Sequence, residues 1–255
     1  MKFEDIHAIV GGIPFIDARK ARYLYGMIVE EGRTDVLELG IAHGAATCYI
    51  AAALDELGGG TVTAVDLEEP QDEFDPSAEE LVSRCGLESC VDIVRMRTGY
   101  NWYLHDKIVE QTDGNSCQEC FDLCIVDGPK NWTIDGAAFF LVDKLLRRGG
   151  KIIFDDYNWT YADADAVRDA TDGITHRSLS DAEKMTPQVK EVVDLLVMQH
   201  PHYGRITMLD SEEWVVAEKV ESDRKVVDVT RTVSIEEVMA RARALFRRGS
   251  RASSP

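Results

Sequence analysis

The chain has 255 residues, 45% of them apolar, and a formal net charge of −18. This length and apolar content predict one sizeable α/β domain with appendages and exclude global disorder. The negative charge repels nucleic-acid phosphates and anionic lipids, which argues against nucleic acids and membrane surfaces as partners. No apolar run reaches the roughly 20 residues of a membrane span and no secretory signal is visible, so we expect a cytoplasmic protein.

Helical periodicity and short apolar runs alternate along the first 155 residues. Helices are expected at 17–31, 45–57, 76–85, 102–111 and 134–146. Buried strands are expected at 36–39, 61–65, 91–96, 121–126 and 151–154. Further on come a helix at 186–199, two β-rich runs at 205–209 and 214–218, and a last helix at 235–246. This order predicts a mostly parallel sheet with helices on both faces, closed by an antiparallel pair of strands.

The loop after the first strand has the glycine spacing of a ligand-binding turn. Its sequence is Glu38-Leu39-Gly40-Ile41-Ala42-His43-Gly44. Gly40 allows a tight turn, and Gly44 allows close approach of the next helix. The G-x-x-x-G spacing differs from the G-x-G-x-x-G of dinucleotide sites and lacks the Lys-Ser/Thr of phosphate loops. An acid at the strand end favours a cationic ligand, so Glu38 is a candidate to bind an amino group.

Two further strand ends extend this candidate site. Asp66 closes the second strand and is placed to accept both hydroxyls of a ribose. Gly99 follows the third strand, where an adenine can lie against the backbone. A lone Asp after a strand is more often a cap or turn residue, but these residues in this order form a specific set.

The run Val36-Leu37-Glu38-Leu39-Gly40-x-x-x-Gly44, followed by Asp66, resembles the first signature motif and the ribose-binding acid of class I S-adenosylmethionine (SAM)-dependent methyltransferases. The resemblance spans about residues 35–220 and is similar in detail to catechol, caffeoyl-CoA and macrocin O-methyltransferases. It implies an α/β, Rossmann-like seven-stranded mixed sheet with the last strand antiparallel, and SAM as cofactor. The cofactor-binding residues expected in this chain are Glu38, Gly40, Ala42, His43, Gly44, Asp66, Gly99 and Asp127.

On this basis we divide the chain into three parts. Residues 1–34 form an N-terminal lid and helix, 35–220 the SAM-dependent methyltransferase domain, and 221–255 a C-terminal helix and basic tail. The tail either docks on the acidic body or a partner subunit, or is a solvated terminus. Many relatives are dimers, so a homodimer is expected. The pair Cys117 and Cys120 either binds zinc, together with Cys85 and Cys90, or remains as thiols or a disulfide.

Three acids follow two neighbouring strands of the predicted sheet. Asp127 comes after the fourth strand, and Asp155 and Asp156 come after the fifth. Both strand ends share one rim, and three crowded acids repel one another strongly unless a cation joins them. Hard oxygen ligands favour Mg²⁺, Mn²⁺ or Ca²⁺. An isolated Asp-Asp pair is otherwise more often a helix cap.

The resemblance assigns roles to these residues. Metal-dependent O-methyltransferases place an Asp after the fourth strand and an Asp-Asn or Asp-Asp pair after the fifth, which Asp127, Asp155 and Asp156 match. Lys130 falls where catechol-type enzymes carry a lysine, which makes Lys130, with Asp127, the catalytic candidate. The metal would lower the pKa of a substrate hydroxyl, Lys130 would take its proton, and the oxygen would attack the sulfonium methyl. The alternatives are a surface role for Lys130 and His43 as the base.

The expected activity is divalent-metal-dependent transfer of a methyl group from SAM to a hydroxyl of a small molecule. The acceptor is a phenol, a catechol or a sugar of a metabolite. The aromatic residues that can line its site are Trp102, Tyr103, Trp132, Tyr157, Trp159 and Tyr161. Macrocin-type enzymes have Asp-Gly-Asp where this chain has Asp127-Gly128-Pro129-Lys130, so the acceptor class stays open. The alternatives are a metal-independent methyltransferase and a non-catalytic cofactor-binding module of the same fold.

Overall fold

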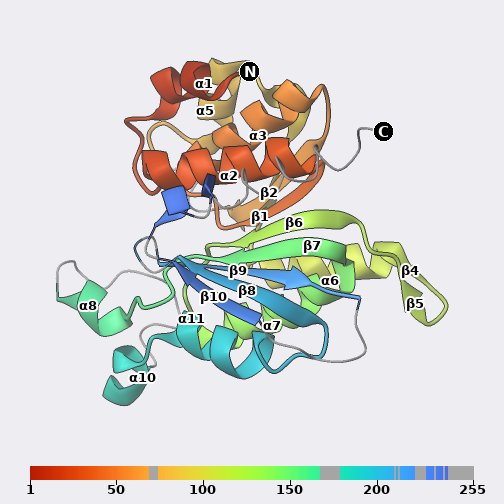
Figure 1. The fold of residues 1–255 in the computed structure, drawn as a ribbon, viewed down its shortest axis with the longest axis vertical. Helices are drawn as coiled ribbons and strands as arrows, with labels where there is room; N and C mark the ends of the chain where they lie inside the picture. The colour runs from red at the N-terminus through yellow and green to blue at the C-terminus, as the bar shows by residue number, and fades with distance from the viewer. Residues whose placement is uncertain are drawn as a thin grey trace, which may run out of the picture.

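An eight-stranded mixed sheet runs through the molecule, in the order β10-β8-β9-β7-β6-β1-β2-β3 (Figure 1). The computed structural model describes residues 1–68, 74–166, 179–209, 211, 213–221, 228–232, 234–237 and 239–240. The strands are β1 Asp35–Leu39, β2 Thr61–Leu67, β3 Val91–Met96, β6 Phe121–Val126, β7 Leu146–Phe154, β8 Tyr203–Leu209, β9 Trp214–Lys219 and β10 Asp228–Thr232. A separate short hairpin consists of β4 Thr112–Asp113 and β5 Ser116–Cys117.

The predicted fold class is confirmed. All seven predicted strands form, and β9, the seventh, pairs antiparallel with both β7 and β8. The other pairs among the first five strands are parallel. Strand β10 adds an eighth member beside β8, parallel to it, in the segment that the sequence assigned to the C-terminal appendage.

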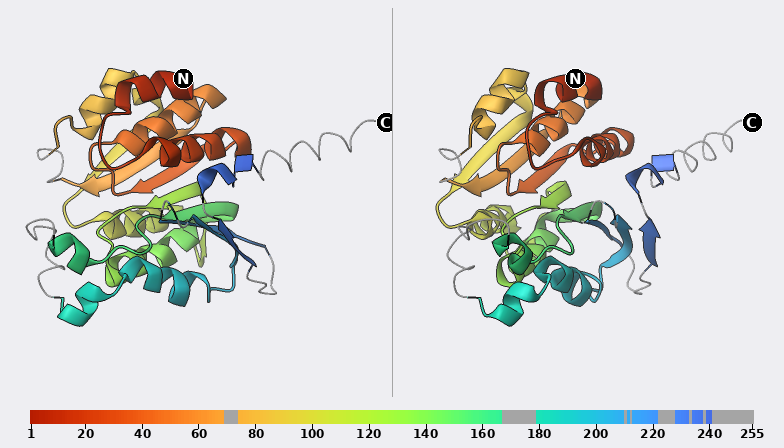
Figure 2. Two further views of the ribbon diagram at one scale, coloured as in Figure 1. Left: turned by 60° about the vertical axis from the view of Figure 1, so that its left-hand side comes forward. Right: turned by 90° about the vertical axis from the view of Figure 1, so that its left-hand side faces the viewer.

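Helices cover both faces of the sheet (Figure 2). They are α1 Phe3–Val10, α2 Ala18–Glu31, α3 Ala45–Leu57, α5 Ala78–Cys85, α6 Tyr100–Gln111, α7 Trp132–Leu145, α8 Tyr161–Asp165, α10 Asp181–Met185 and α11 Gln188–Glu191. Two short helical segments complete the set, η1 Glu88–Cys90 and the π-helical η2 Val192–Val197. On one face α1, α2, α3 and α5 pack together; on the other α6, α7, α11 and η2 do so (Figure 1).

Local sequence signals set the helix ends. The side chain of Asp17 accepts hydrogen bonds from the backbone of Arg19 and Lys20 and begins α2. Asn131 begins α7 in the same way, accepting from Thr133 N and Ile134 N. The last predicted helix, 235–246, lies mostly outside the described residues, although 235–237 and 239–240 are helical.

The N-terminal segment shares the core of the sheet. Phe3, Ile6 and Val10 of α1, a helix the sequence did not predict, are each at most 4% exposed. The ring of Phe3 stacks on Tyr49 of α3 at 5.4 Å. The division at residue 34 and the lid role of the N-terminal segment stay predictions. Among the described helices, none combines the length and apolarity that a bilayer crossing needs.

Candidate active site

The ends of four parallel strands bring the predicted site residues to one rim. Leu39 of β1 pairs with Val126 of β6, and Val126 pairs with Phe154 of β7. The next residues continue this ladder, because Asp127 N donates to Leu39 O at 2.9 Å and Asp155 N donates to Val126 O at 3.2 Å. The acids after β6 and β7 therefore begin at the same level as the glycine loop after β1.

The two predicted glycines are required by close contacts. Gly40 has φ +90°, and a Cβ there would lie 2.3 Å from the carbonyl oxygen of Asp127. Gly44 has φ +79°, and its Cβ would lie 2.8 Å from that of Ala78. Both positions combine a left-handed backbone with no room for a side chain. The glycine loop is thus in direct backbone contact with the loop after β6.

Asp66 holds the glycine loop in place. Its Oδ2 accepts hydrogen bonds from Ile41 N at 2.9 Å and Ala42 N at 3.0 Å, while its Oδ1 accepts one from Leu67 N at 2.8 Å. Ala42 itself adopts φ +46°. A ribose contact by Asp66, like the cofactor contacts of Ala42 and of Gly99, which precedes α6, stays a prediction.

Glu38 lies beneath the loop. It is 2% exposed and accepts a hydrogen bond from the hydroxyl of Thr47 at 2.6 Å. Burial raises the pKa of Glu38 to about 8; the bond from Thr47 opposes this, and the charges of Asp127 and Asp66 add to it. The sequence placed Glu38 at the strand end but gave no sign of its partner in α3.

His43 belongs to an aromatic group beside the glycine loop. Its Nδ1 lies 2.8 Å from the carbonyl oxygen of Pro76, and its ring contacts those of Phe15 and Phe74 at 5.8 and 4.6 Å between centroids. Phe15 is 66% exposed and adopts φ +78°. His43 is therefore held within this group by a backbone carbonyl and two rings, and the prediction that it contacts the cofactor stands untested.

Two lysines interleave with the three acids at the rim. Lys130 Nζ lies 2.7 Å from Asp127 Oδ1 and 3.3 Å from Asp156 Oδ2. Lys20, from α2, pairs with Asp155 at 2.7 Å, and these two side chains are 15% and 8% exposed. The sequence singled out Lys130 but not Lys20, because nothing in the helical pattern of α2 distinguishes Lys20 from a surface lysine.

The charges of this cluster hold Lys130 in its protonated form. Burial disfavours the ammonium, but the carboxylates of Asp127 and Asp156 outweigh it and raise the pKa of Lys130 above its ordinary range. Burial also raises the pKa of Asp127, which Lys130 opposes and Asp155 reinforces. The surrounding carboxylates therefore favour the charged form of Lys130, and its role as a base stays a prediction.

The rim loops carry backbone strain. Lys130 and Asp156 both have φ +57°, a left-handed conformation that is unfavourable for residues other than glycine. Asp156 N donates to the side chain of Asp155 at 2.7 Å, which tightens that turn. Strained residues of this kind gather at functional sites, where the surrounding structure fixes them.

A buried polar network supports the loop after β6 from below. The hydroxyl of Tyr100 donates to the carboxylate of Asp135, which also accepts from Asn131 N at 2.7 Å. A Cβ on Gly128 would lie 2.4 Å from the Tyr100 hydroxyl oxygen, so only glycine fits there. Tyr161 donates to the carbonyl oxygen of Pro129 at 2.5 Å. These contacts join residues far apart in the sequence, so no local sequence pattern predicts them.

The side chains at the rim offer oxygen ligands of the kind that hard divalent cations prefer, but their ligand atoms are not gathered around one point. Burial raises the pKa of Glu213, and the nearby carboxylates of Asp156 and Asp155 raise it further. Four carboxylates face two ammonium groups, so the cluster has a net charge of 2 − 4 = −2 if all are ionised. The three aspartates do not meet directly: in the described part of the chain, the one group with three ligand atoms within 4.8 Å is Asp143, His200 and His202.

Comparison with known proteins shows which family this chain resembles. Residues 37–157, which run from the glycine loop's strand to the turn after β7, match the family described as "Methyltransferase domain". Over this segment the chain is similar to class I, SAM-dependent methyltransferases. Its fold is that of solved O-methyltransferases, and a comparison with curated proteins gave no match.

Three similar structures illustrate this likeness. An O-methyltransferase from Bacillus cereus in complex with SAH is 19% identical, with 85% of this chain and 90% of that one covered and a TM-score of 0.56. A Staphylococcus aureus protein titled a caffeoyl-CoA O-methyltransferase is 19% identical (86% and 92% covered, TM-score 0.58). TomG, an O-methyltransferase from Streptomyces achromogenes involved in tomaymycin synthesis, in complex with SAM, is 17% identical (86% and 91%, 0.55).

The aromatic residues predicted to line an acceptor site differ in exposure, with Tyr103 and Trp159 intermediate. Tyr157 and Tyr161 are buried, at 6% and 1% exposed, and support the rim loops. Trp102 and Trp132, at the first turns of α6 and α7, are 54% and 37% exposed. The exposed pair remains available to contact a ligand. All six cysteines are free thiols, and none belongs to the metal-compatible group found in the described residues.

Proposed function

We propose that this methyltransferase moves a methyl group from SAM to a hydroxyl oxygen of a small molecule at the rim formed by β1, β6 and β7. The observation that carries the proposal is the contact between its two halves. The turn at Gly40 lies against the carbonyl of Asp127, so the predicted sulfonium pocket adjoins the cluster of acids and lysines. An acceptor placed at that cluster is next to the methyl donor, and positioning two reactants is the main task of such an enzyme.

The residues of the chain supply orientation and proton handling. The acceptor oxygen forms a bond to the methyl carbon, the sulfur–carbon bond breaks, and the hydroxyl proton must leave. We propose that Asp127, Asp155 and Asp156 hold a divalent cation of the Mg²⁺ type, which would polarise the acceptor hydroxyl when bound. Lys130 is placed beside this oxygen, and can accept its proton only when added positive charge offsets the carboxylates that raise the pKa of Lys130.

A metal-independent variant of the same reaction has an observation in its favour. Lys20 and Lys130 already pair with all three aspartates. In this variant the Lys130 ammonium orients the acceptor oxygen by a hydrogen bond, and Asp127, whose pKa is raised by burial, takes the proton. The two variants differ in their response to chelation.

Calorimetric titration with SAM, followed by a methyl-transfer screen with and without Mg²⁺ and EDTA, tests the proposal. Phenols, catechols and glycosylated metabolites are the acceptors to screen, since Trp102 and Trp132 offer flat apolar surfaces. SAM binding with turnover that disappears on exhaustive chelation supports the metal-dependent form. Turnover that survives chelation leaves the metal-independent variant. Binding of NADH without SAM would overturn the proposal as a whole.

Assembly and location are part of the proposal. We propose a homodimer that acts in the cytoplasm on a small hydroxylated molecule. Sedimentation of the purified chain tests the assembly. A mass corresponding to one chain at micromolar concentration would overturn the proposal of a dimer. Expression of the chain with a fluorescent tag in its own host tests the location.

A further inference from the structure

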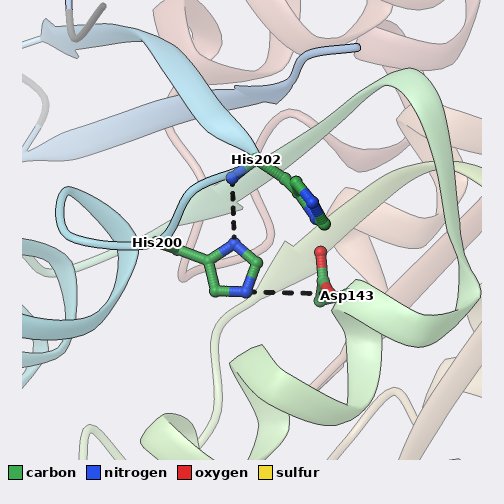
Figure 3. Close-up of side chains that lie close together, drawn as sticks. All are labelled: Asp143, His200 and His202. Carbon is green, nitrogen blue, oxygen red and sulfur yellow. Dashed lines mark hydrogen bonds and ion pairs between the residues drawn. The ribbon is translucent and has the colours of Figure 1, made fainter. Parts of the chain in front are cut away.

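A second cluster of metal-ligating side chains lies at the end of α7 away from the rim. Asp143 sits two residues before α7 ends, and His200 and His202 flank Pro201 just before β8 begins. Figure 3 shows the carboxylate and the two imidazole rings facing one another. Twelve residues separate Asp143 from the Asn131 cap of α7, or about 18 Å of helix, so this cluster is separate from the rim acids.

The three side chains offer ligand atoms at close range. One such atom from each residue lies within 4.8 Å of the others. His200 Nε2 is 3.9 Å from Asp143 Oδ2, and these side chains are 15% and 18% exposed. The ring of Phe139 packs edge-on against that of His200 at 5.4 Å, which fixes its plane. The site is thus partly shielded but open to solvent for an incoming ion.

Two buried polar atoms of this cluster have no hydrogen-bond partner in the described part of the chain: Asp143 Oδ1 and His202 Nδ1. Buried polar atoms in native proteins are nearly always satisfied, so each needs an explanation. A cation held between the carboxylate and the imidazoles satisfies both atoms at once.

Lys219 does not fill this role. Its Nζ lies 3.5 Å from Asp143 Oδ1, but its three protons have other acceptors. These are Glu119 Oε1 at 2.8 Å, the carbonyl oxygen of Asp143 at 2.5 Å and that of Leu146 at 2.7 Å. Glu119 matches the charge of Lys219, which leaves the carboxylate of Asp143 available to a second cation.

We propose that Asp143, His200 and His202 form a binding site for a borderline transition-metal ion of the Zn²⁺ type. Two imidazole nitrogens and one carboxylate oxygen are ligands that Zn²⁺, Co²⁺ and Ni²⁺ accept readily, whereas Mg²⁺ and Ca²⁺ prefer oxygen alone. The ion would join α7 to the chain entering β8, a structural tie between two layers of the fold. Three protein ligands leave a further position for water.

Metal binding requires one local rearrangement. His202 N lies 3.3 Å from His200 Nδ1 and donates to it, which leaves the proton of the neutral ring on Nε2. Coordination through Nε2 moves that proton to Nδ1 and ends this hydrogen bond, which is longer than the usual 2.9–3.0 Å.

Binding of Co²⁺ to the full chain, followed by its visible absorption and by competition with Zn²⁺, tests the site. The variants are His202→Ala, Asp143→Asn and, as a matched control, His105→Ala, which changes an exposed histidine on α6. A fourth variant, Asp155→Asn, disables the proposed rim site. Circular dichroism in EDTA verifies that each variant is folded.

At the histidine-containing site we expect one Co²⁺, with affinity reduced at least tenfold by His202→Ala and by Asp143→Asn, and unchanged by His105→Ala and Asp155→Asn. Zn²⁺ should also raise the melting temperature of the wild-type chain but not of His202→Ala. Absence of Co²⁺ binding, or binding that His202→Ala leaves unaltered, overturns the proposal. Binding lost only in Asp155→Asn assigns the ion to the rim and equally overturns it. None of these outcomes depends on methyl transfer.

Discussion

Replacement of Lys130 is the most direct test of the proposed chemistry, as distinct from a test of the fold. Its ammonium bridges the carboxylates of Asp127 and Asp156, beside the proposed acceptor position. Lys130→Met should lower kcat by about 100-fold or more, the usual effect of losing a positioned proton-transfer group. The KM for SAM should change little. Steady-state kinetics with Lys107→Met, a half-buried ion-paired lysine on α6, provides the control; equal rates for the two variants would remove Lys130 from the reaction.

Gly40 is the residue where the backbone leaves no room for a side chain. Gly40→Ala places a methyl group 2.3 Å from a carbonyl oxygen at φ +90°. We expect a loss of about 1–3 kcal/mol in unfolding free energy and a marked loss of SAM affinity. Gly12→Ala is the matched control, because nothing lies within 4 Å of its Cβ. Urea unfolding and calorimetry measure both effects, and wild-type values for Gly40→Ala would refute the steric argument.

For single residues, the sequence predicts where a side chain lies in the fold better than it predicts which residues that side chain contacts. Asp127, Asp155 and Asp156 could be placed at one rim because parallel strands all end there. Their roles as ligands, and that of Lys130 as base, remain predictions. Lys20 could not be found, since its pairing with Asp155 joins residues 135 positions apart. The Tyr100–Asp135 bond was equally out of reach, because it depends on how α6 and α7 pack.

At the level of elements, the buried carboxyl of Glu38, at the junction of β1 and α3, makes the stability of the fold depend on pH. Because the pKa of Glu38 is about 8 in the folded chain and about 4.3 in an unfolded one, the folded state favours the protonated form. Its contribution to stability is complete below the unfolded value and is lost as pH rises through about 8. Asp127 and Asp135 titrate in the same direction, so only a comparison with a variant isolates Glu38.

Glu38→Gln should therefore flatten the loss of stability between pH 5 and pH 8.5 in the cofactor-free chain. The amide keeps an acceptor for the Thr47 hydroxyl and carries no charge. Where the folded and unfolded states differ by one bound proton, the unfolding free energy changes by up to about 1.4 kcal/mol for each pH unit. Urea unfolding at both pH values measures it, beside Glu30→Gln on the exposed side of α2. Identical pH slopes for Glu38→Gln and wild type would contradict the assigned burial effect.

Some element boundaries followed the sequence where a glycine marked them. Helix α3 occupies the predicted 45–57 because Gly58, with φ +84°, ends it. Strand β7 begins at Leu146 rather than 151, since Arg147 to Gly150 look like a turn but extend the strand. Helix α1 was missed because its buried face, Phe3, Ile6 and Val10, is short and gains its stability from α2 and α3.

For the whole molecule, the packing of α1 decides whether the N-terminal segment belongs to the body of the fold. Ile6 is fully buried, and Ile9 on the same helix is 45% exposed. Ile6→Ala should cost about 2–5 kcal/mol of unfolding free energy, and Ile9→Ala less than about 0.5 kcal/mol. Chemical unfolding of both variants measures the difference. Equal small effects would show that α1 is a loosely attached appendage.

The overall architecture was the most predictable feature, because alternating strands and helices admit few arrangements. The eighth strand was not predicted, since 228–232 follows a polar, charged stretch and pairs at the edge beside β8. The acidic surface charge fits a protein whose partners are small molecules, and it leaves their identity open to the acceptor screen.

The contact between Gly40 and the carbonyl of Asp127 has a mechanical consequence. In the proposed function, the donor and the acceptor bind on the two sides of this contact, so a change in one binding site should alter the other. Binding of the methyl donor should therefore change the shape of the acceptor site. We therefore expect an ordered sequence of ligand entry, with SAM first, which product-inhibition kinetics with SAH can establish.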